Sequence, residues 1–125
     1  MDDAALIRAS CLEVMGWKEV KGQIAENEFR MSSLGNCPFA LIYDQWGRNW
    51  DPLGIDHDSW QMLDKLADEG LEYEVGTDTL VSSPYVYVQV GVESKNTVHL
   101  RPISPKNRRR AIVLSALKAK GVDVG

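Results

Sequence analysis

The sequence has little of several features that identify particular classes of protein. Cysteine occurs only as Cys11 and Cys37, too few for the disulfide framework of a small secreted domain. No apolar run approaches the roughly 20 residues that a membrane-spanning helix needs. Lysine and arginine number 14 against 18 aspartates and glutamates, so the formal net charge is −4. These shortages argue against a disulfide scaffold, a membrane protein and direct nucleic-acid binding.

The N-terminus lacks the basic stretch of a secretory signal peptide, since it opens with Met1, Asp2 and Asp3. Without such a signal, we expect reduced thiols and a cytoplasmic location. A chain of 125 residues with 44% hydrophobic and 26% charged residues has the size and balance of one domain. Because no repeat or linker divides it, we expect a single domain over residues 1–125.

Patterns of catalytic or metal-binding residues are also missing. Asp56, His57 and Asp58 are neighbours, but adjacent residues at a helix start point in different directions. A metal site needs three or four convergent ligands, and the second histidine, His99, falls in a predicted strand. No nucleophile motif or phosphate-binding glycine loop is present. We therefore expect no cofactor, no metal and no enzymatic activity.

What the sequence does contain predicts three helices. The first spans residues 3–15, with an aspartate as N-cap and glycine after its end. The second has Asp56 as its N-cap and stops at Gly70. The third follows an N-cap at Ser104 and stops at Gly121. The helical spacing of apolar residues between these signals supports all three helices.

The remaining segments predict strands and loops. We expect strands at residues 39–43, 71–75, 85–92 and 97–100, a turn at 76–78, a loop at 31–38 and an irregular or edge segment at 18–30. In the strand 85–92, four valines share one face, and the opposite face carries Tyr85, Tyr87 and Gln89. An exposed face normally carries charges, so we expect both faces to be covered, by helices or by a partner subunit. The predicted fold is α+β, a three-layer α-β-α sandwich with a mainly antiparallel sheet and three helices.

Three of the four tryptophans lie just before or within the start of the second helix. Trp46, Trp50 and Arg48 could stack on a flat ring or a base and form a ligand-binding loop. Alternatively, the tryptophans close one end of the core while Asp51 and Pro52 fix the turn into the helix.

A second candidate site is the run Arg108, Arg109 and Arg110 near the start of the third helix. Cations in the first turns of a helix oppose its dipole, so these residues are locally unfavourable there. A helix N-terminus with added arginines can bind a phosphate or a carboxylate. The alternative is a solvated face, or ion pairs with acidic residues of the second helix.

Three blocks of the sequence resemble a family of small phage and prophage proteins, the phage α-β-α sandwich domain family. They are Leu12-Glu13-Val14-Met15-Gly16-Trp17, then Trp50-Asp51-Pro52-Leu53 with Trp60-Gln61-Met62-Leu63-Asp64-Lys65-Leu66, and an aromatic strand followed by Arg110-Ala111-Ile112-Val113-Leu114-Ser115-Ala116-Leu117. The resemblance implies a phage-encoded sandwich domain and carries no catalytic residue set. This chain departs from the family in its arginine run and in its longer charged stretch at residues 18–30.

From the resemblance and the missing catalytic groups we expect a phage accessory protein that binds a host or phage protein, or a phosphate-bearing nucleotide, and inhibits host defence. As a nucleotide sponge, it would hold phosphates with the arginine run and stack a base on Trp46, Trp50 or Tyr87. As a protein inhibitor, it would meet a basic partner through an acidic surface. That surface comprises Glu26, Glu28, Asp64, Asp68 and Glu69.

The alternative is a virion structural or assembly protein. It would form a homo-oligomer through the strand face that carries Tyr85, Tyr87 and Gln89, or through the charged hairpin that follows this strand.

Overall fold

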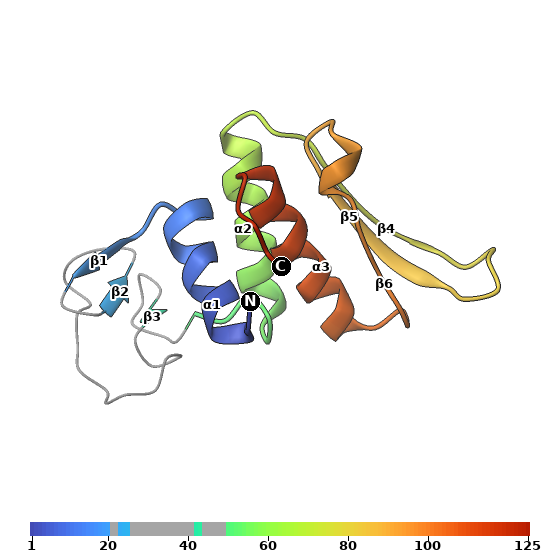
Figure 1. The fold of residues 1–125 in the computed structure, drawn as a ribbon, viewed down its shortest axis with the longest axis horizontal. Coiled ribbons are helices and arrows are strands. Elements are labelled where there is room, and N and C mark those ends of the chain that lie inside the picture. The colour runs from blue at the N-terminus through green and yellow to red at the C-terminus, as the bar shows by residue number, and fades with distance from the viewer. Residues whose placement is uncertain (21–22, 26–41, 44–49) are drawn as a thin grey trace.

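The computed structural model describes residues 1–20, 23–25, 42–43 and 50–125 (Figure 1). Three α-helices and two separate three-stranded sheets form the described part of the chain. Helices pack on an antiparallel sheet, so the predicted α+β class is confirmed. No helix among the described residues is long and apolar enough to cross a membrane.

The N-terminal helical segment consists of α1 (Asp3–Ala9) and a π-helical continuation, η1 (Ser10–Val14). Asp2 is the N-cap, and its carboxylate accepts a backbone N–H of the first turn at 2.8 Å. Gly16 follows the segment with a φ of +70°, a conformation that favours glycine. The prediction of a helix over residues 3–15 is therefore confirmed, with a change of hydrogen-bonding pattern that the sequence did not predict.

Helix α2 (Asp56–Asp68) has Ile55 at its N-cap position, so the prediction of Asp56 as N-cap is wrong. Asp56 is the first helical residue, and its carboxylate accepts hydrogen bonds from two arginines of α3. Its carboxylate is therefore engaged with α3, through charge-assisted bonds that are stronger than neutral ones. The predicted stop is confirmed, because Gly70 follows the helix with a φ of +90°.

The larger sheet has the order β4-β5-β6, with antiparallel neighbours. Its strands are β4 (Tyr73–Asp78), β5 (Tyr85–Val90) and β6 (Val98–Leu100). Residues 76–78 belong to β4, so the turn predicted there is wrong. Gly76 lies opposite Tyr87, and an added Cβ would lie 2.7 Å from the tyrosine hydroxyl oxygen. This glycine makes room for an aromatic ring and does not mark a turn.

The inner face of β5 carries Val86, Val88 and Val90, which are buried against helix α3 (Pro105–Ala119). Val92 was predicted on the same face but is 88% exposed. The strand ends before it, and Gly91 turns the chain with a φ of +76°.

Figure 1 shows the three α-helices on one side of this sheet, with α3 next to it. On the opposite side, Tyr85, Tyr87 and Gln89 are half-buried. A covering layer on this second face, which the predicted sandwich requires, stays a prediction.

The smaller sheet has the order β1-β2-β3 and follows the first helical segment. Strands β1 (Lys18–Val20) and β2 (Gln23–Ala25) are antiparallel, and β3 (Ile42–Tyr43) pairs with β2 in parallel. Part of the stretch predicted to be irregular or at an edge thus forms paired strands. The loop predicted at 31–38 lies outside the described residues.

The core lies where α3 meets α2, the first helical segment and the larger sheet. Cys11 is completely buried there, and burial raises the pKa of its thiol far above the ordinary range. The other fully buried large side chains include Leu6, Ile7, Trp50, Met62, Leu63, Leu66, Ile112 and Leu117.

Candidate functional site

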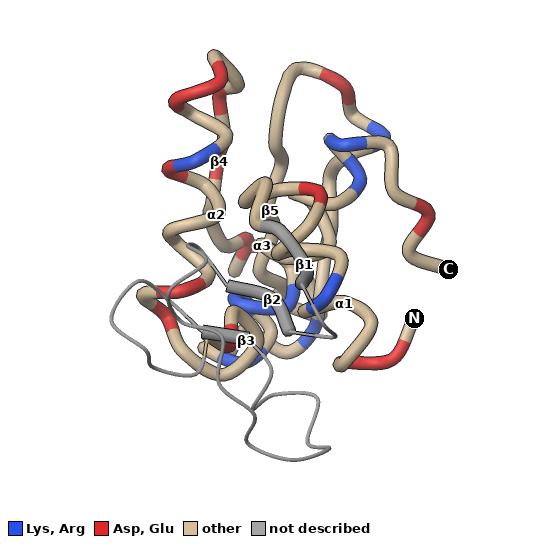
Figure 2. Tube along the Cα trace, turned by 90° about the vertical axis from the view of Figure 1, so that its left-hand side faces the viewer, with Lys and Arg blue, Asp and Glu red and all other residues tan. Residues whose placement is uncertain are grey.

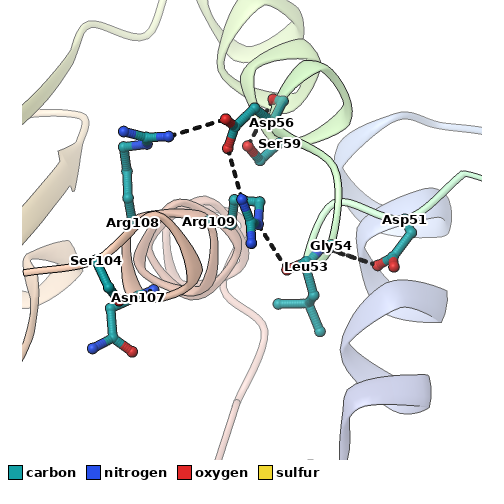
Figure 3. A network of polar contacts seen from close by, with 9 residues as sticks. All are labelled: Asp51, Leu53, Gly54, Asp56, Ser59, Ser104, Asn107, Arg108 and Arg109. Atoms are coloured by element: carbon teal, nitrogen blue, oxygen red, sulfur yellow. Dashed lines mark hydrogen bonds and ion pairs between the residues drawn. The ribbon is translucent and has the colours of Figure 1, made fainter.

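The predicted arginine site lies where the N-termini of α3 and α2 meet (Figure 3). Ser104 caps α3 as predicted, and its hydroxyl accepts the Asn107 N–H at 3.0 Å. In the first turns of α3, Arg108 donates to one carboxylate oxygen of Asp56 at 3.1 Å, and Arg109 donates to the other at 3.0 Å. The two guanidinium groups thus share one carboxylate.

Further contacts extend this network. Arg109 also donates through Nε to the backbone oxygen of Leu53 at 3.0 Å. Arg110 reaches α1, where its guanidinium lies 2.8 Å from a carboxylate oxygen of Asp3. The bonds from Arg109 and Arg108 hold the pKa of Asp56 below its ordinary value.

All three arginines of the run are therefore engaged with aspartates at the starts of other helices. This is the arrangement that the alternative of ion pairs predicted, here to Asp56 of α2 and also to Asp3 of α1. The contacts join the start of α3 to the starts of α2 and α1. A ligand-binding role for Arg108, Arg109 and Arg110 stays a prediction.

The candidate tryptophan site is described only in part, because Trp46 and Arg48 lie outside the described residues. Trp50 is completely buried, and its ring lies edge-on to that of Trp17 with centroids 4.9 Å apart. Its indole N–H donates to the Gln61 side chain at 3.0 Å. Trp50 packs in the core, as the alternative predicted, and offers no surface on which a base could stack.

The turn into α2 is held by two aspartates. The side chain of Asp51 accepts the N–H groups of Leu53 and Gly54, both at 3.1 Å. Asp58 is buried and accepts the Asp51 N–H at 2.9 Å, whereas Asp56 points toward α3. Across the described ranges, no three His, Cys, Asp or Glu residues are grouped so that they could hold a metal ion.

The predicted acidic surface is partly described. Asp64, Asp68 and Glu69 are exposed on or just after α2, where Figure 2 shows a succession of acidic residues. Lys120 lies 2.6 Å from the Glu69 carboxylate. Glu26 and Glu28 lie outside the described residues.

A further surface is formed by the side of the larger sheet that faces away from α3. Strand register places Glu74 opposite Gln89, Asp78 opposite Tyr85, and Tyr87 opposite His99. Residues that face each other across an antiparallel pair point to the same side. We call this surface the outer sheet face, and it comprises Glu74, Asp78, Tyr85, Tyr87, Gln89 and His99.

The centre of the outer sheet face is aromatic. The Tyr85 ring lies edge-on to His99 with centroids 4.8 Å apart, and Tyr87 lies 6.4 Å from both rings. The guanidinium carbon of Arg101, just after β6, lies 4.9 Å from the Tyr85 centroid. Rings packed against one another in this way are held in place, so they have little conformational freedom to lose on binding.

Hydrogen bonds hold the tyrosine hydroxyls on this face. Tyr87 donates to Glu74 at 2.9 Å, and Tyr85 donates to Asp78 at 3.2 Å. The bond to Glu74 and partial desolvation raise the pKa of Tyr87, while desolvation and the bond to Asp78 raise that of Tyr85. Both hydroxyls therefore stay protonated at neutral pH.

An open cavity of about 520 Å³ adjoins the Glu74 end of the outer sheet face. Two carboxylates and one aromatic ring contribute to its walls. The lining residues are Glu72, Tyr73, Glu74, Gln89, Gly91 and Val92. The face and its cavity thus combine aromatic rings with negative charge.

No family model, curated protein or solved structure matches the chain. The resemblance to phage sandwich-domain proteins therefore stays a prediction, and the candidate surface must be judged on its own chemistry.

Sequence reasoning identified part of this surface. The alternation of residues 85–90 places Tyr85, Tyr87 and Gln89 on one face, as the structure confirms. It missed His99 and Arg101, because their positions depend on how β6 pairs with β5. Charged and apolar residues alternate before Gly76, and this pattern could have placed Glu74 on an exposed face of a strand.

Proposed function

We propose that the protein acts by binding another protein through the outer sheet face, without catalysis. The observation that carries this proposal is the half-exposed cluster of Tyr85, Tyr87 and His99, with Arg101 stacked beside it. Tyrosine and arginine are enriched in protein interfaces, because they combine large contact areas with hydrogen bonding. A fixed face of this kind suits a protein surface better than a small substrate.

A protein partner is favoured over a nucleotide. The arginines that a nucleotide sponge would use for phosphate are engaged with Asp56 and Asp3, and Trp50 is buried. On the outer sheet face, Glu74 and Asp78 would repel phosphate groups. Calorimetry against cyclic dinucleotides and cyclic ADP-ribose isomers should give no heat of binding, and a clear heat with any of them would restore the sponge hypothesis.

The resemblance to phage sandwich-domain proteins supports a biological setting for this binding. It favours a phage-encoded accessory protein in the cytoplasm of a bacterial host. In that setting, the partner is a component of a host defence system, and binding inhibits it.

The second candidate function is a virion structural or assembly protein that self-associates through the same face. One edge of the sheet carries Glu74 and Asp78, and the other carries His99 and ends next to Arg101. A twofold axis along β5, lying in the interface, would set the acidic edge of one copy against the basic edge of the other. Sedimentation of the purified chain tests this, since a monomer at all concentrations eliminates it.

The binding proposal is tested with a double variant, Tyr85→Ser/Tyr87→Ser, used as bait in a host-cell lysate. Both positions are partly exposed, so circular dichroism should show an intact fold. The matched control is Lys106→Ser, which alters an exposed side chain at the start of α3. We expect a partner that the wild type and the control recover and the double variant does not. Equal recovery by all three proteins would refute the proposal.

A further inference from the structure

The turn between β4 and β5 is the most exposed apolar feature of the described chain. All residues from 79 to 84 are exposed, and Leu80 retains 97% of its accessible surface, with Val81 beside it at 40%. Figure 1 shows the β4–β5 hairpin extending away from the helices, with this turn at its far end. The helical body therefore leaves the leucine side chain uncovered.

Although exposed, the turn is held in place at both ends. Asp78 accepts the Leu80 N–H at 3.0 Å through one carboxylate oxygen and the Tyr85 hydroxyl at 3.2 Å through the other. Arg101 donates through Nε to the Ser83 carbonyl oxygen at 2.9 Å while its guanidinium stacks on Tyr85. These contacts connect the turn directly to the outer sheet face.

The composition of the turn also restricts its backbone. It contains no glycine, Val81 is β-branched, and Pro84 limits both its own φ and the conformation of Ser83. A segment that is already ordered loses little conformational entropy when it binds. Leu80 is therefore a preorganised apolar side chain at the end of a binding face.

We propose that Leu80 is the anchor of the binding surface and inserts into an apolar pocket of the partner protein, with Val81 packing at the rim of that pocket. This inference rests on the proposed function and adds the chemistry of the partner. Most of the binding energy of a protein interface comes from a few side chains that fill pockets of the partner.

The charges beside the turn favour an apolar protein pocket without a surplus of either charge as the occupant. Residues 79–84 carry no charge, and the charged side chains that contact them are Asp78, which accepts the Leu80 N–H, and Arg101, which donates to the Ser83 carbonyl oxygen, so the two charges balance. An anionic membrane surface attracts basic segments and requires more apolar area than one leucine and one valine provide. A pocket lined by apolar side chains, with balanced charges around it, would complement this turn.

The test uses p-benzoylphenylalanine, a photo-crosslinking amino acid, placed at position 80 in cells that carry the natural gene. The matched control position is 92, because Val92 is similarly exposed but lies past the other end of β5. We expect one protein to be crosslinked from position 80 and not from position 92. That protein is then purified, and its affinity for the variants is measured by calorimetry.

With the purified partner, Leu80→Ser should weaken binding by roughly thirtyfold, as expected for the loss of an anchoring side chain. Val92→Ser should bind like the wild type, and added salt should change the affinity little because the charges beside the turn balance. Both side chains are almost fully exposed, so neither change should alter the melting temperature.

The inference is overturned if position 80 crosslinks to no protein, only to lipid, or only to a second copy of the chain. It is also overturned if Leu80→Ser binds like the wild type. In that last case, weaker binding by Tyr85→Ser/Tyr87→Ser would leave the proposed function standing without its anchor. Wild-type affinity in both variants would refute the proposed function as well.

Discussion

At the scale of single residues, Asp56 shows how one side chain can take a role other than its local one. Its position at the start of α2 suits an N-cap, but two guanidinium groups from α3 occupy its carboxylate. The contact joins residues more than 50 positions apart in the chain, at 3.0 and 3.1 Å. Asp56 therefore contributes to tertiary structure more than to the start of its own helix.

This role predicts a pH-dependent effect of Asp56→Asn. The pKa of Asp56 is lowered in the folded chain, so its stabilisation is fully present above the ordinary carboxyl pKa and is lost as the pH falls through the lowered folded value. At pH 7 the variant should melt at a lower temperature than the wild type. The difference should shrink as the pH falls below about 4, where the carboxyl group begins to take up its proton.

Thermal melting monitored by circular dichroism between neutral and acid pH measures this difference. Asp64→Asn is the control, because it removes an exposed aspartate from the same helix. A constant difference between Asp56→Asn and the wild type at all pH values would contradict an ionic role for Asp56.

At the scale of secondary-structure elements, α3 is joined to the larger sheet by a buried serine. The Ser115 hydroxyl accepts the Val90 N–H at 3.0 Å and donates to the Asn96 carbonyl oxygen at 2.6 Å. Both backbone groups lie in the buried contact between helix and sheet. The Ser115 hydroxyl thus satisfies one backbone group of β5 and one of the turn that follows this strand.

Ser115→Ala should lower the free energy of unfolding by about 2 to 4 kcal/mol, because it leaves a buried N–H and a buried carbonyl without this partner. Urea denaturation measures the change. Ser10→Ala is a matched control, since Ser10 is equally buried and its hydroxyl donates at 2.7 Å to the Leu6 carbonyl oxygen one turn earlier. The Leu6 carbonyl oxygen also accepts the Ser10 backbone N–H, so Ser10→Ala should lower the free energy of unfolding by less than Ser115→Ala does. Equal losses in the two variants would contradict the proposed role of Ser115.

The elements also show which parts of the fold could be predicted from sequence. Helix α3 was predictable because its signals are local: Ser104 as cap, proline in the first turn and a glycine after the end. The turn at 76–78 was predicted wrongly because Gly76 accommodates the ring of Tyr87 on the neighbouring strand. Local patterns identify elements, whereas this contact depends on strand pairing.

The same distinction applies to the candidate site. Alternation alone placed Tyr85 and Tyr87 together on the outer sheet face. The contacts of His99 and Arg101 with Tyr85 required the register between β5 and β6. The engagement of the arginine run required the packing of α3 against α2, which no local pattern encodes.

At the scale of the whole molecule, Trp50 joins the segment before α2 to the N-terminal part of the chain. Its ring packs on Trp17 and its indole N–H is bonded to Gln61 of α2. Trp50→Ala should lower the free energy of unfolding by about 3 to 5 kcal/mol. This is a large part of the roughly 5 to 15 kcal/mol that stabilises a typical domain.

Chemical denaturation of Trp50→Ala beside Trp60→Ala tests this expectation. Trp60 is only half-buried, with its ring 6.3 Å from that of Tyr73, and its loss should cost less. If Trp50→Ala proves as stable as the wild type, Trp50 has no structural role and its candidacy as a ligand-binding residue reopens.

The burial of Cys11 makes its thiol a probe for the opening of the core. Only the thiolate reacts with alkylating reagents, and this thiol is both sealed from water and held in its protonated form. In a Cys37→Ser background, reagent can modify Cys11 only during excursions that separate the helices around it. The rate at which Cys11 is labelled therefore measures how often the core opens. A partner that binds the folded protein should slow this labelling, even if it does not contact the thiol.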